Sequence, residues 1–304
     1  MAEPDTNPGR VANDCSILKG GDSIVGASRG ASPGTQPDGA DAHRGTIEVD
    51  DAVKRFEGGV LAVDRVSFSA APGEFVSVIG PSGCGKSTLL RLAAGLIPLT
   101  SGRIAINGSE VTDPRQDVAL MFQKPTLLPW QTALENTLLP RRLHGRAGRA
   151  AEDEAYGLLE MVGLGGFEHT YPRHLSGGMQ QRVALARLLM VGVGVLLLDE
   201  PFAAVDQLTR ERLNLELLKV HARINATAVL VTHNITEAIL LADRVLVMTP
   251  RPGRISDVIT VPFERPRAPQ MAKEPEFQDL VFRAHEGLHG VGDADVATED
   301  DDGV

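Results

Sequence analysis

Residues 80 to 88 read Gly80-Pro81-Ser82-Gly83-Cys84-Gly85-Lys86-Ser87-Thr88, and this stretch decides the fold of the chain. It fits the pattern G-x-x-x-x-G-K-[ST] and lies between an apolar run at residues 75–79 and a helix-like run at residues 89–96. Glycines at 80, 83 and 85 allow backbone N–H groups to approach phosphate oxygens, and the dipole of the following helix adds positive potential. The stretch therefore predicts a strand, a phosphate-binding loop and a helix.

The end of this loop carries the side chains with assigned chemistry. Lys86 is expected to reach the β- and γ-phosphates of a nucleotide, and the Ser87 hydroxyl is expected to ligate Mg²⁺. Cys84 occupies a position that the pattern leaves free, and we interpret it as a small residue that fills space.

Length and composition indicate a globular protein with a sizeable core, in one large or two modest domains, because 42% of 304 residues are hydrophobic. The longest apolar run, residues 188–198, is far shorter than the roughly 18 to 20 residues that span a bilayer, and the start of the chain lacks a signal-peptide pattern. The two cysteines, Cys15 and Cys84, imply no disulfide framework. A chain that is neither secreted nor self-inserting, in a reducing cytoplasm, is expected.

The formal net charge of −10 argues against a general nucleic-acid binder. Much of this charge lies in residues 292–304, which hold six acids and no base, so an acidic disordered tail is expected there. Residues 1–44 are rich in Gly, Ser, Pro, Ala and Asp and show no hydrophobic period, which predicts a disordered leader.

Strand-like and helix-like runs alternate along the rest of the chain, which predicts an α/β fold with a mainly parallel sheet. The expected strands are residues 46–49, 61–71, 75–79, 102–106, 118–122, 193–198, 226–232, 244–249 and 254–261. The expected helices outside the middle of the chain are residues 208–224 and 235–241. The Asn107-Gly108 pair after the fourth run predicts a hairpin, and thus an antiparallel β region.

The chain changes character between about residues 125 and 190. Helix-like runs occur at residues 132–139, 150–162 and 180–189, and strand-like runs are absent, so a helical subdomain is expected. Residues 263–291 form a Pro-rich linker and one amphipathic helix, in which apolar residues recur at helical spacing. These residues are Phe277, Leu280, Val281, Ala284 and Leu288.

Two further stretches carry chemistry. Asp199 and Glu200 end an apolar strand, where Asp199 would hold Mg²⁺ and Glu200 could polarise an attacking water. Ser176-Gly177-Gly178-Met179-Gln180 precedes a helical run and offers a second helix N-terminus to phosphate oxygens.

Together with Val231-Thr232-His233, these motifs resemble, in their order, the nucleotide-binding subunit of ABC transporters. The resemblance covers about residues 46–261, implies the P-loop NTPase fold of ABC ATPase type and places that domain at residues 45–262. It implies a head-to-tail homodimer in which each ATP lies between the phosphate loop of one subunit and Ser176, Gly177, Gly178 and Gln180 of the other.

The resemblance also implies roles for single residues. Gln123 would sense Mg²⁺ and the γ-phosphate, His233 would stabilise the transition state, Asp206 would act across the dimer, and Phe56 would stack on adenine. A phenylalanine after a strand is commonly a core residue, so packing in the core stays an alternative for Phe56. Asn234 departs from the Asp that is frequent after the histidine, which puts in doubt how this segment is held.

The stretch around Leu127-Leu128-Pro129-Trp130 resembles the subgroup that energises importers of nitrate, sulfonate and taurine. It implies a peripheral protein on the cytoplasmic face of the membrane that contacts a permease after Gln123, with a solute-binding protein as an indirect partner. The alternative for the apolar residues is the core of the helical subdomain. Alternative functions are a non-transport ABC ATPase, which would be expected to show a coiled coil or a duplicated domain, and a regulatory nucleotide-binding module, which could lack Glu200.

Overall fold

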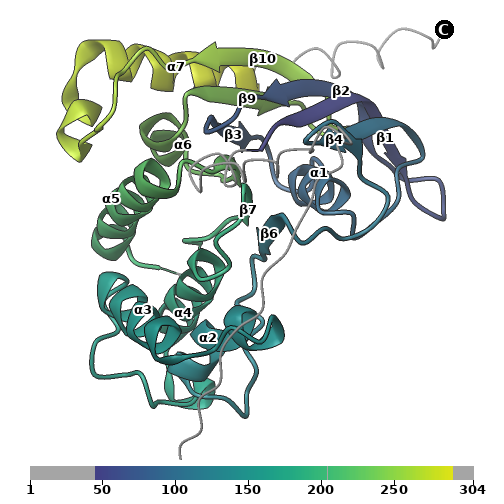
Figure 1. The fold of residues 1–304 in the computed structure, drawn as a ribbon. Coiled ribbons are helices and arrows are strands. Elements are labelled where there is room, and N and C mark those ends of the chain that lie inside the picture. The colour runs from purple at the N-terminus through teal and green to yellow at the C-terminus, as the bar shows by residue number, and fades with distance from the viewer. Residues whose placement is uncertain (1–44, 204, 290–304) are drawn as a thin grey trace, which may run out of the picture. The chain divides into compact units, whose positions relative to one another are not determined.

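The computed structural model describes residues 45–203 and 205–289 (Figure 1). The expected disordered leader, residues 1–44, and acidic tail, residues 292–304, lie outside the described residues. No helix within the described ranges is both long enough and apolar enough to cross a lipid bilayer.

A six-stranded sheet lies at the centre, in the order β10-β9-β3-β8-β7-β6 (Figure 1). Neighbouring strands run parallel except β10, which pairs antiparallel with β9. The strands are β3 (Phe75–Ile79), β6 (Val118–Met121), β7 (Val195–Asp199), β8 (Thr227–Val231), β9 (Arg244–Met248) and β10 (Ile255–Thr260). Every residue of β3, β7 and β8 is buried, which explains why these strands read as continuous apolar runs.

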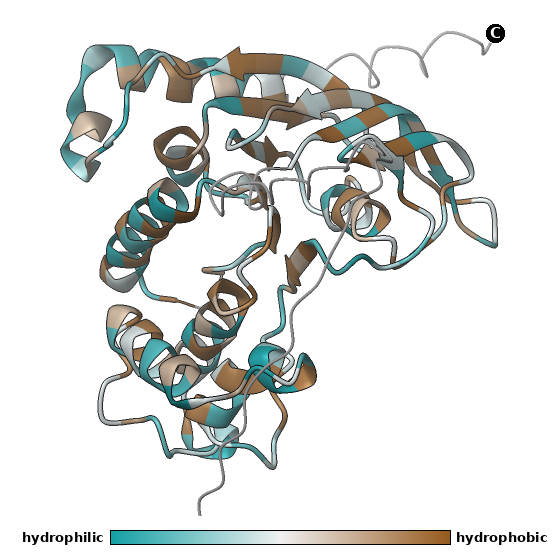
Figure 2. Ribbon diagram, viewed as in Figure 1, coloured by the Kyte–Doolittle hydropathy of each residue, from teal (hydrophilic) through white to brown (hydrophobic). Residues whose placement is uncertain are grey.

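Successive residues of the central strands face opposite sides of the sheet, and each side has its own core. Leu196 and Leu198 of β7 belong to a cluster that includes residues of the helices α5 (Gln207–Ile224) and α6 (Ile235–Leu241). Val195 and Leu197 belong to a second cluster, which contains the helix α1 (Lys86–Ala93). Figure 2 shows the resulting concentration of hydrophobic residues along β6 and β7. The sheet is therefore covered on both faces.

A four-stranded antiparallel sheet, in the order β2-β1-β4-β5, contributes to the second core. Its strands are β1 (Ile47–Arg55), β2 (Leu61–Ala70), β4 (Ser101–Ile106) and β5 (Ser109–Glu110). The predicted hairpin is confirmed, since Ile106 pairs with Ser109 across Asn107 and Gly108, both at positive φ. The predicted end of the first strand at Val49 was too early: a register shift between Val49 and Ala52 breaks the apolar alternation while the backbone keeps pairing.

Three α-helices and no strand occupy residues 125–190, all of which the structure describes. They are α2 (Ala133–Leu143), α3 (Arg149–Met161) and α4 (Gly177–Leu189), and a short 3₁₀ helix, η2 (Pro172–His174), precedes α4. Thr132 and Glu135 form a reciprocal capping box that starts α2. The sequence expectation of a helical stretch without strands matches these elements.

The C-terminal segment contains the 3₁₀ helix η3 (Pro269–Lys273) and the helix α7 (Pro275–His289). Phe277 and Ala284, both predicted to face inward, are buried, and α7 packs against α6, β9 and β10. The predicted amphipathic helix is thus confirmed.

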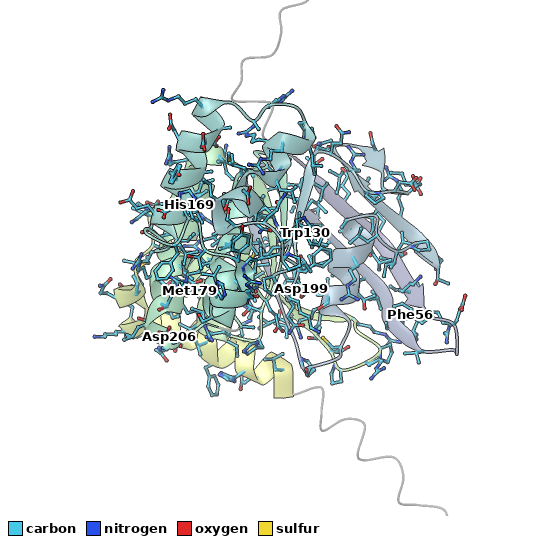
Figure 3. The ribbon with its side chains drawn as sticks, turned by 90° about the horizontal axis from the view of Figure 1, so that it is seen from below. Phe56, Trp130, His169, Met179, Asp199 and Asp206 are labelled. Carbon is cyan, nitrogen blue, oxygen red and sulfur yellow. The ribbon has the colours of Figure 1, made fainter. Side chains whose placement is uncertain are left out.

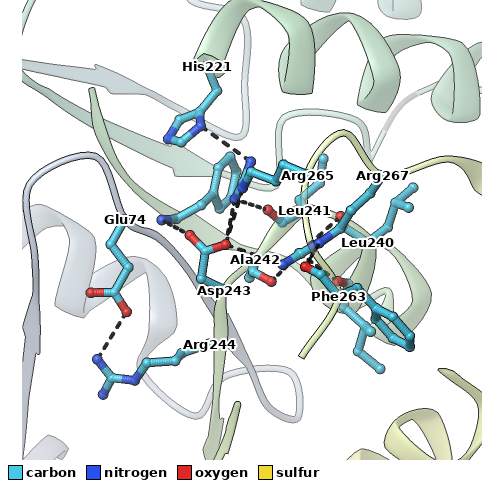
Figure 4. Close-up of polar contacts among 12 residues, drawn as sticks. Glu74, His221, Leu240, Leu241, Ala242, Asp243, Arg244, Phe263, Arg265 and Arg267 are labelled. Carbon is cyan, nitrogen blue, oxygen red and sulfur yellow. Dashed lines mark hydrogen bonds and ion pairs between the residues drawn. The ribbon is translucent and has the colours of Figure 1, made fainter. Parts of the chain in front are cut away.

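Two arginines tie this segment to the end of α6 (Figure 4). Arg265 donates to the Leu241 carbonyl at 2.9 Å and to the Asp243 carboxylate at 3.0 Å. Arg267 is buried and contacts the same carboxylate at 3.3 Å. Its guanidinium also donates to the carbonyls of Ile239, Leu240, Ala242 and Phe263. Since helix-end carbonyls need donors, the arginines complete the C-terminus of α6.

Candidate functional site

The phosphate loop connects the end of β3 to the start of α1. Gly85 is the N-cap of α1 at φ 113°, and a Cβ there would lie 2.5 Å from the carbonyl oxygen of Ala62, so glycine is required for two reasons. Gly83 also has a positive φ, of 77°. The helix begins at Lys86, three residues before the start predicted from the apolar run, because the loop residues Lys86, Ser87 and Thr88 form its first turn.

Lys86 points into the loop and is buried. Its ammonium donates to the carbonyl oxygens of Gly80 at 2.8 Å and Pro81 at 2.9 Å, and it lies 3.8 Å from the sulfur of Cys84. Cys84 is 1% exposed and packs in the second core, as expected for a residue that fills space. A buried ammonium held only by neutral carbonyls is a favourable partner for an anion.

Asp199, the last residue of β7, contacts the phosphate loop through Ser87. Its Oδ1 accepts a hydrogen bond of 2.8 Å from the Ser87 hydroxyl, and the residue is 3% exposed. Burial raises the pKa of this carboxyl, the Ser87 hydrogen bond opposes the rise, and the neighbouring Glu200 adds to it. The Ser87 hydroxyl and the Asp199 carboxylate therefore lie side by side at the end of the phosphate loop.

Three polar side chains follow three adjacent parallel strands. Gln123 comes after β6, Glu200 after β7 and His233 after β8. The Gln123 amide donates to Glu200 Oε2 at 3.0 Å, and His233 Nδ1 lies 3.6 Å from the same oxygen. The carboxyl ends of parallel strands meet at one edge of a sheet, which is where α/β proteins bind ligands.

Glu200 itself has a strained backbone, with φ at 47° in a residue other than glycine. Its N–H donates to the Val231 carbonyl of β8 at 2.9 Å, which fixes the turn after β7 against the neighbouring strand. This strained turn therefore holds the Glu200 carboxylate in a position that Gln123 and His233 both approach.

A cavity of about 340 Å³ opens beside the phosphate loop, and Asp199 and His233 are not among the residues that line it. The predicted site residues that line it are Phe56, Ser82, Gly83, Gly85, Lys86, Ser87, Thr88, Gln123 and Glu200. Larger cavities, of about 540 and 770 Å³, occur elsewhere, but no predicted site residue lines either of them. The chemistry of the lining therefore decides which cavity is the candidate site.

Phe56 lies at the mouth of this cavity and is 41% exposed, which contradicts the core alternative for this residue. Lys54 Nζ lies 5.3 Å from the centroid of its ring. An exposed aromatic face beside a phosphate loop can stack on a nucleobase.

Arg251 also lines the cavity, and the sequence analysis missed it. The turn that carries it is anchored by Gly253, whose N–H donates to the Ala62 carbonyl at 3.1 Å. A Cβ on Gly253 would lie 2.1 Å from the carbonyl oxygen of Cys84, so the turn packs directly on the phosphate loop. The glycine in a Pro-rich turn was the available signal, but it did not indicate which segment the turn approaches.

The second predicted phosphate-binding segment does not line this cavity. Ser176 is the N-cap of α4, accepts a hydrogen bond from the Met179 N–H at 3.2 Å and is exposed together with Gly177. Gln180 donates to the carbonyls of Pro172 and Leu175, which braces the turn before α4. Within one chain, Ser176, Gly177, Gly178 and Gln180 stay apart from the phosphate loop.

Asp206 is the N-cap of α5, where its carboxylate accepts a hydrogen bond from the Thr209 N–H at 3.0 Å. Hydrogen bonding to Thr209 lowers the pKa of Asp206. Figure 3 shows Met179 and Asp206 on one side of Asp199, and Phe56 on the other. The site is therefore divided between two regions of the chain's surface.

Comparison with known proteins identifies the family. A family model described as "ABC transporter" matches residues 63–203. A taurine import ATP-binding protein of Rhizobium johnstonii is 40% identical over 79% of this chain and 93% of its own length. A nitrate import ATP-binding protein of Synechocystis sp. is 41% identical over 76% of this chain and 90% of its own length. The chain belongs to the ABC transporter ATP-binding family. It is an ATPase of the type that is coupled to transport.

A solved dimeric structure supports the same assignment. An ATP-binding cassette in a post-hydrolysis state, bound to ADP and Pi, is 31% identical, with a TM-score of 0.66 over 72% of this chain and 100% of that one. The cassette fold predicted from the motifs, with a mainly parallel core, an antiparallel region and helices, is confirmed.

The cassette's donor set fits the Mg²⁺ that typically accompanies ATP in this family. The Ser87 hydroxyl and the Asp199 carboxylate lie 2.8 Å apart, and Gln123 lines the same cavity. All three can offer oxygen atoms, which Mg²⁺ prefers, and nucleotide phosphates and water would complete the coordination.

The apolar residues after Gln123 were expected either to be exposed for contact with a permease or to form the core of the helical subdomain, and the structure shows some of each. Leu127 packs against the main core, whereas Trp130 is 70% exposed. Leu128 is half-buried, and its backbone is held by the buried amide of Asn136 at 2.8 and 3.1 Å. This cassette thus presents an exposed indole on a turn that is hydrogen-bonded to Asn136 of α2.

Proposed function

We propose that this cassette is the ATP-hydrolysing subunit of a membrane importer for a small anionic solute of the nitrate, sulfonate or taurine kind, driven by ATP-dependent homodimerisation. The observation that carries the proposal is the divided site. Phosphate-loop residues, Gln123 and Glu200 line the cavity, while Ser176 and Gly177 lie exposed outside it and Gly178 is half-buried. A second copy, docked head to tail, can supply the missing half.

ATP binding is assigned to the phosphate loop. The ammonium of Lys86, now held by loop carbonyls, would move to the β- and γ-phosphates, and the N–H groups at the start of α1 would contact them as well. Phe56 would stack on adenine. Ser87 and Asp199, with Gln123, would hold Mg²⁺, which when bound neutralises charge on the phosphates.

Hydrolysis is assigned to the residues after β6, β7 and β8. Glu200 would orient the attacking water and accept its proton, since its carboxylate lines the cavity beside the phosphate loop. His233 lies 3.6 Å from that carboxylate and is 59% exposed, so it can reach the γ-phosphate side of the site. The Gln123 amide donates a hydrogen bond to the same carboxylate, and Gln123 lies just before the helical subdomain.

The dimer would complete each site through the partner's α4. Ser176, Gly177 and Gly178 would present N–H groups and a hydroxyl to the γ-phosphate, with Gln180 bracing their turn, and Asp206 would act across the interface. Because the γ-phosphate joins the two halves, dimerisation is expected to require ATP and to weaken after hydrolysis.

Coupling to transport would use the region after Gln123. The exposed Trp130, on a turn fixed by Asn136, suits contact with a helix of a permease subunit at the cytoplasmic face of the membrane. A solute-binding protein would be an indirect partner. The division into a cassette at residues 45–262, with a helical subdomain at about 125–190, and a C-terminal segment at 263–291 belongs to this proposal.

Mixing two inactive variants tests the composite site. Lys86→Ala damages the phosphate loop and Ser176→Arg blocks the second half, so each homodimer lacks a working site. A mixed dimer contains one intact site and one site with both defects, and partial recovery of ATPase activity on mixing is expected. No recovery on mixing, or steady activity from a wild-type monomer, would contradict the proposal.

A further inference from the structure

A buried polar cluster lies directly behind the His233 segment and has no role in the reaction described above. Its centre is the carboxyl group of Glu237 on α6, a residue that is 5% exposed. Thr232, at the end of β8, and Asn214, on α5, are also buried, at 2% and 4% exposed. Polar side chains at this depth are costly unless they are hydrogen-bonded, so the cluster needs an explanation.

Two hydrogen bonds join Glu237 to the turn that carries His233, and a third lies within the turn. The Thr232 hydroxyl donates to Glu237 Oε2, and the Asn234 N–H donates to the Thr232 oxygen at 3.0 Å. The Glu237 N–H donates to Asn234 Oδ1 at 3.0 Å. The residues on both sides of His233 are therefore bonded to the same glutamate or to each other, which fixes the peptide units on either side of the imidazole.

The end of β8 is also part of the catalytic edge of the sheet. The Thr232 N–H donates to the Val78 carbonyl of β3 at 3.2 Å, and the adjacent Val231 carbonyl accepts from Glu200. A displacement of Thr232 would change the direction of His233 relative to the Glu200 carboxylate, which it approaches to 3.6 Å.

The cluster extends from α6 to the start of α5. Burial raises the pKa of the Glu237 carboxyl, while the hydrogen bond from Thr232 and the nearby charges of Arg210 and His233 oppose the rise. Arg210 Nη2 donates to the Val205 carbonyl at 3.0 Å, next to the Asp206 N-cap. Arg210 thus lies between the Asp206 end of α5, which it contacts directly, and the Glu237 carboxyl, which its charge influences.

If position 237 served only for packing, an apolar residue would fill it without the free-energy cost of burying a carboxyl group. The opposite end of α6 is held by the carbonyl contacts of Arg265 and Arg267, so the helix does not need Glu237 to be anchored (Figure 4). The contacts of Glu237 are instead concentrated on the turn before the helix.

We propose that Glu237 is a positioning residue that holds the Thr232–Asn234 turn so that His233 faces the Glu200 carboxylate. The inference rests on the proposed function in one respect, that His233 acts in ATP hydrolysis. Glu237 itself does not touch the nucleotide, and its effect on the reaction passes through the imidazole.

The test uses the full chain and a double-mutant comparison. Glu237→Met keeps the length of the side chain and removes the acceptor for the Thr232 hydroxyl, so kcat is expected to fall about tenfold, the rate equivalent of one lost hydrogen bond, with KM for ATP changed less than about twofold. Glu237→Gln keeps an acceptor oxygen and is expected to restore most of the rate. Glu211→Met is the matched control and should leave kcat unchanged, because Glu211 is an exposed acid on α5 whose carboxylate accepts a hydrogen bond from Gln207.

The deciding measurement repeats Glu237→Met in a His233→Ala background. Residues that act through one another are not additive, so the second substitution should then lower kcat by less than about twofold. A further tenfold fall in the His233→Ala background, or an unchanged kcat for Glu237→Met alone, would overturn the inference. If Glu237→Met does not fold, Thr232→Val removes the same hydrogen bond from the other side, and Thr232→Ser serves as its rescue.

If His233→Ala has no measurable ATPase rate, nuclear magnetic resonance of the His233 ring provides a test that does not depend on activity. The imidazole resonance of His233, assigned by its loss in His233→Ala, should shift or broaden in Glu237→Met and stay in place in Glu211→Met. An unchanged resonance in Glu237→Met would overturn the inference. Either failure leaves the mixing test of the composite site unaffected, so failure of the positioning role and failure of the proposed function can be told apart.

Discussion

The hydroxyl of Ser87 donates a 2.8 Å hydrogen bond to the carboxylate of Asp199, although 112 positions separate the two residues in the chain. Ser87 is part of the first turn of α1, and Asp199 is the end of β7, so the contact joins the phosphate loop to the acidic strand end. Glu200, to which we assign the catalytic carboxylate, follows immediately, on a strained turn that β8 holds in place. Changes at this edge of the sheet should therefore affect catalysis more than folding.

Glu200→Gln is expected to lower the ATPase turnover by roughly 100-fold or more, the scale of lost general-base assistance, while ATP affinity is kept. The glutamine has the same shape but cannot accept a proton from water. Turnover and equilibrium nucleotide binding, measured on the same preparation, check the prediction, and nucleotide should accumulate in a stable dimer. Turnover close to that of the wild type would exclude the proposed role.

Phe56→Ala is expected to weaken ATP binding by about 1 to 2 kcal/mol through loss of stacking on adenine. Since Phe56 is 41% exposed, the nucleotide-free protein should unfold at nearly the same temperature. Calorimetric binding and thermal unfolding without nucleotide measure the two effects separately. A loss of stability of about 3 kcal/mol or more, as for a core phenylalanine, would contradict this placement.

His221 is expected to make stability depend on pH. Burial is the main cause that lowers its pKa to about 4, with the charge of Arg265 adding to the effect. Between the usual histidine pKa of about 6.5 and about 4, the unfolded chain takes up a proton that the folded chain does not. The contribution of His221 to stability is thus present above pH 6.5 and is lost as the pH falls toward 4.

The size of this loss is about 3 kcal/mol, at about 1.4 kcal/mol for each pH unit of the shift. Unfolding free energies measured in denaturant at several pH values should therefore fall more steeply in the wild type than in His221→Asn, which has no titrating ring. Parallel pH curves for the two proteins would show that His221 does not titrate in this way.

Arg267→Met is expected to destabilise the fold by about 3 kcal/mol, because the substitution leaves buried α6 carbonyls without donors and removes a partner of Asp243. The matched control is Arg283→Met, which breaks an exposed ion pair with Asp257 and should cost less than about 1 kcal/mol. Chemical unfolding of both variants checks the difference. Equal costs would mean that the buried arginine does not stabilise the end of α6.

The local sequence pattern was sufficient to predict those parts of the site whose geometry depends on residues adjacent in the chain. The loop from Gly80 to Thr88 carries its own backbone requirements, and the buried runs of β3, β7 and β8 end at the residues that carry chemistry. Asp199 and Glu200 could be chosen because they end such a run, whereas the role proposed for His233 came from the resemblance to ABC ATPases. The helical spacing of Phe277 and Ala284 likewise showed which face of α7 is buried.

Contacts between distant segments could not be deduced in this way. β1 continues to Arg55 because its backbone pairs with β2 and β4, and pairing across a bulge leaves no apolar period to detect. Arg251 lines the candidate cavity because Gly253 lets its turn pack against the phosphate loop. An arginine in a Pro-rich turn looks the same in sequence wherever the turn lies.

By itself, the sequence determined the nucleotide-binding chemistry of this cassette, because glycines, a lysine and carboxylates at fixed spacing act through the local backbone. Only the tertiary structure decided that Ser176 lies outside the cavity, that Trp130 is exposed and that Glu237 accepts a hydrogen bond from Thr232, next to His233. These relationships depend on how α4, α5 and α6 pack against the sheet. Packing is set by side-chain contacts between segments far apart in the chain, and no local pattern records them.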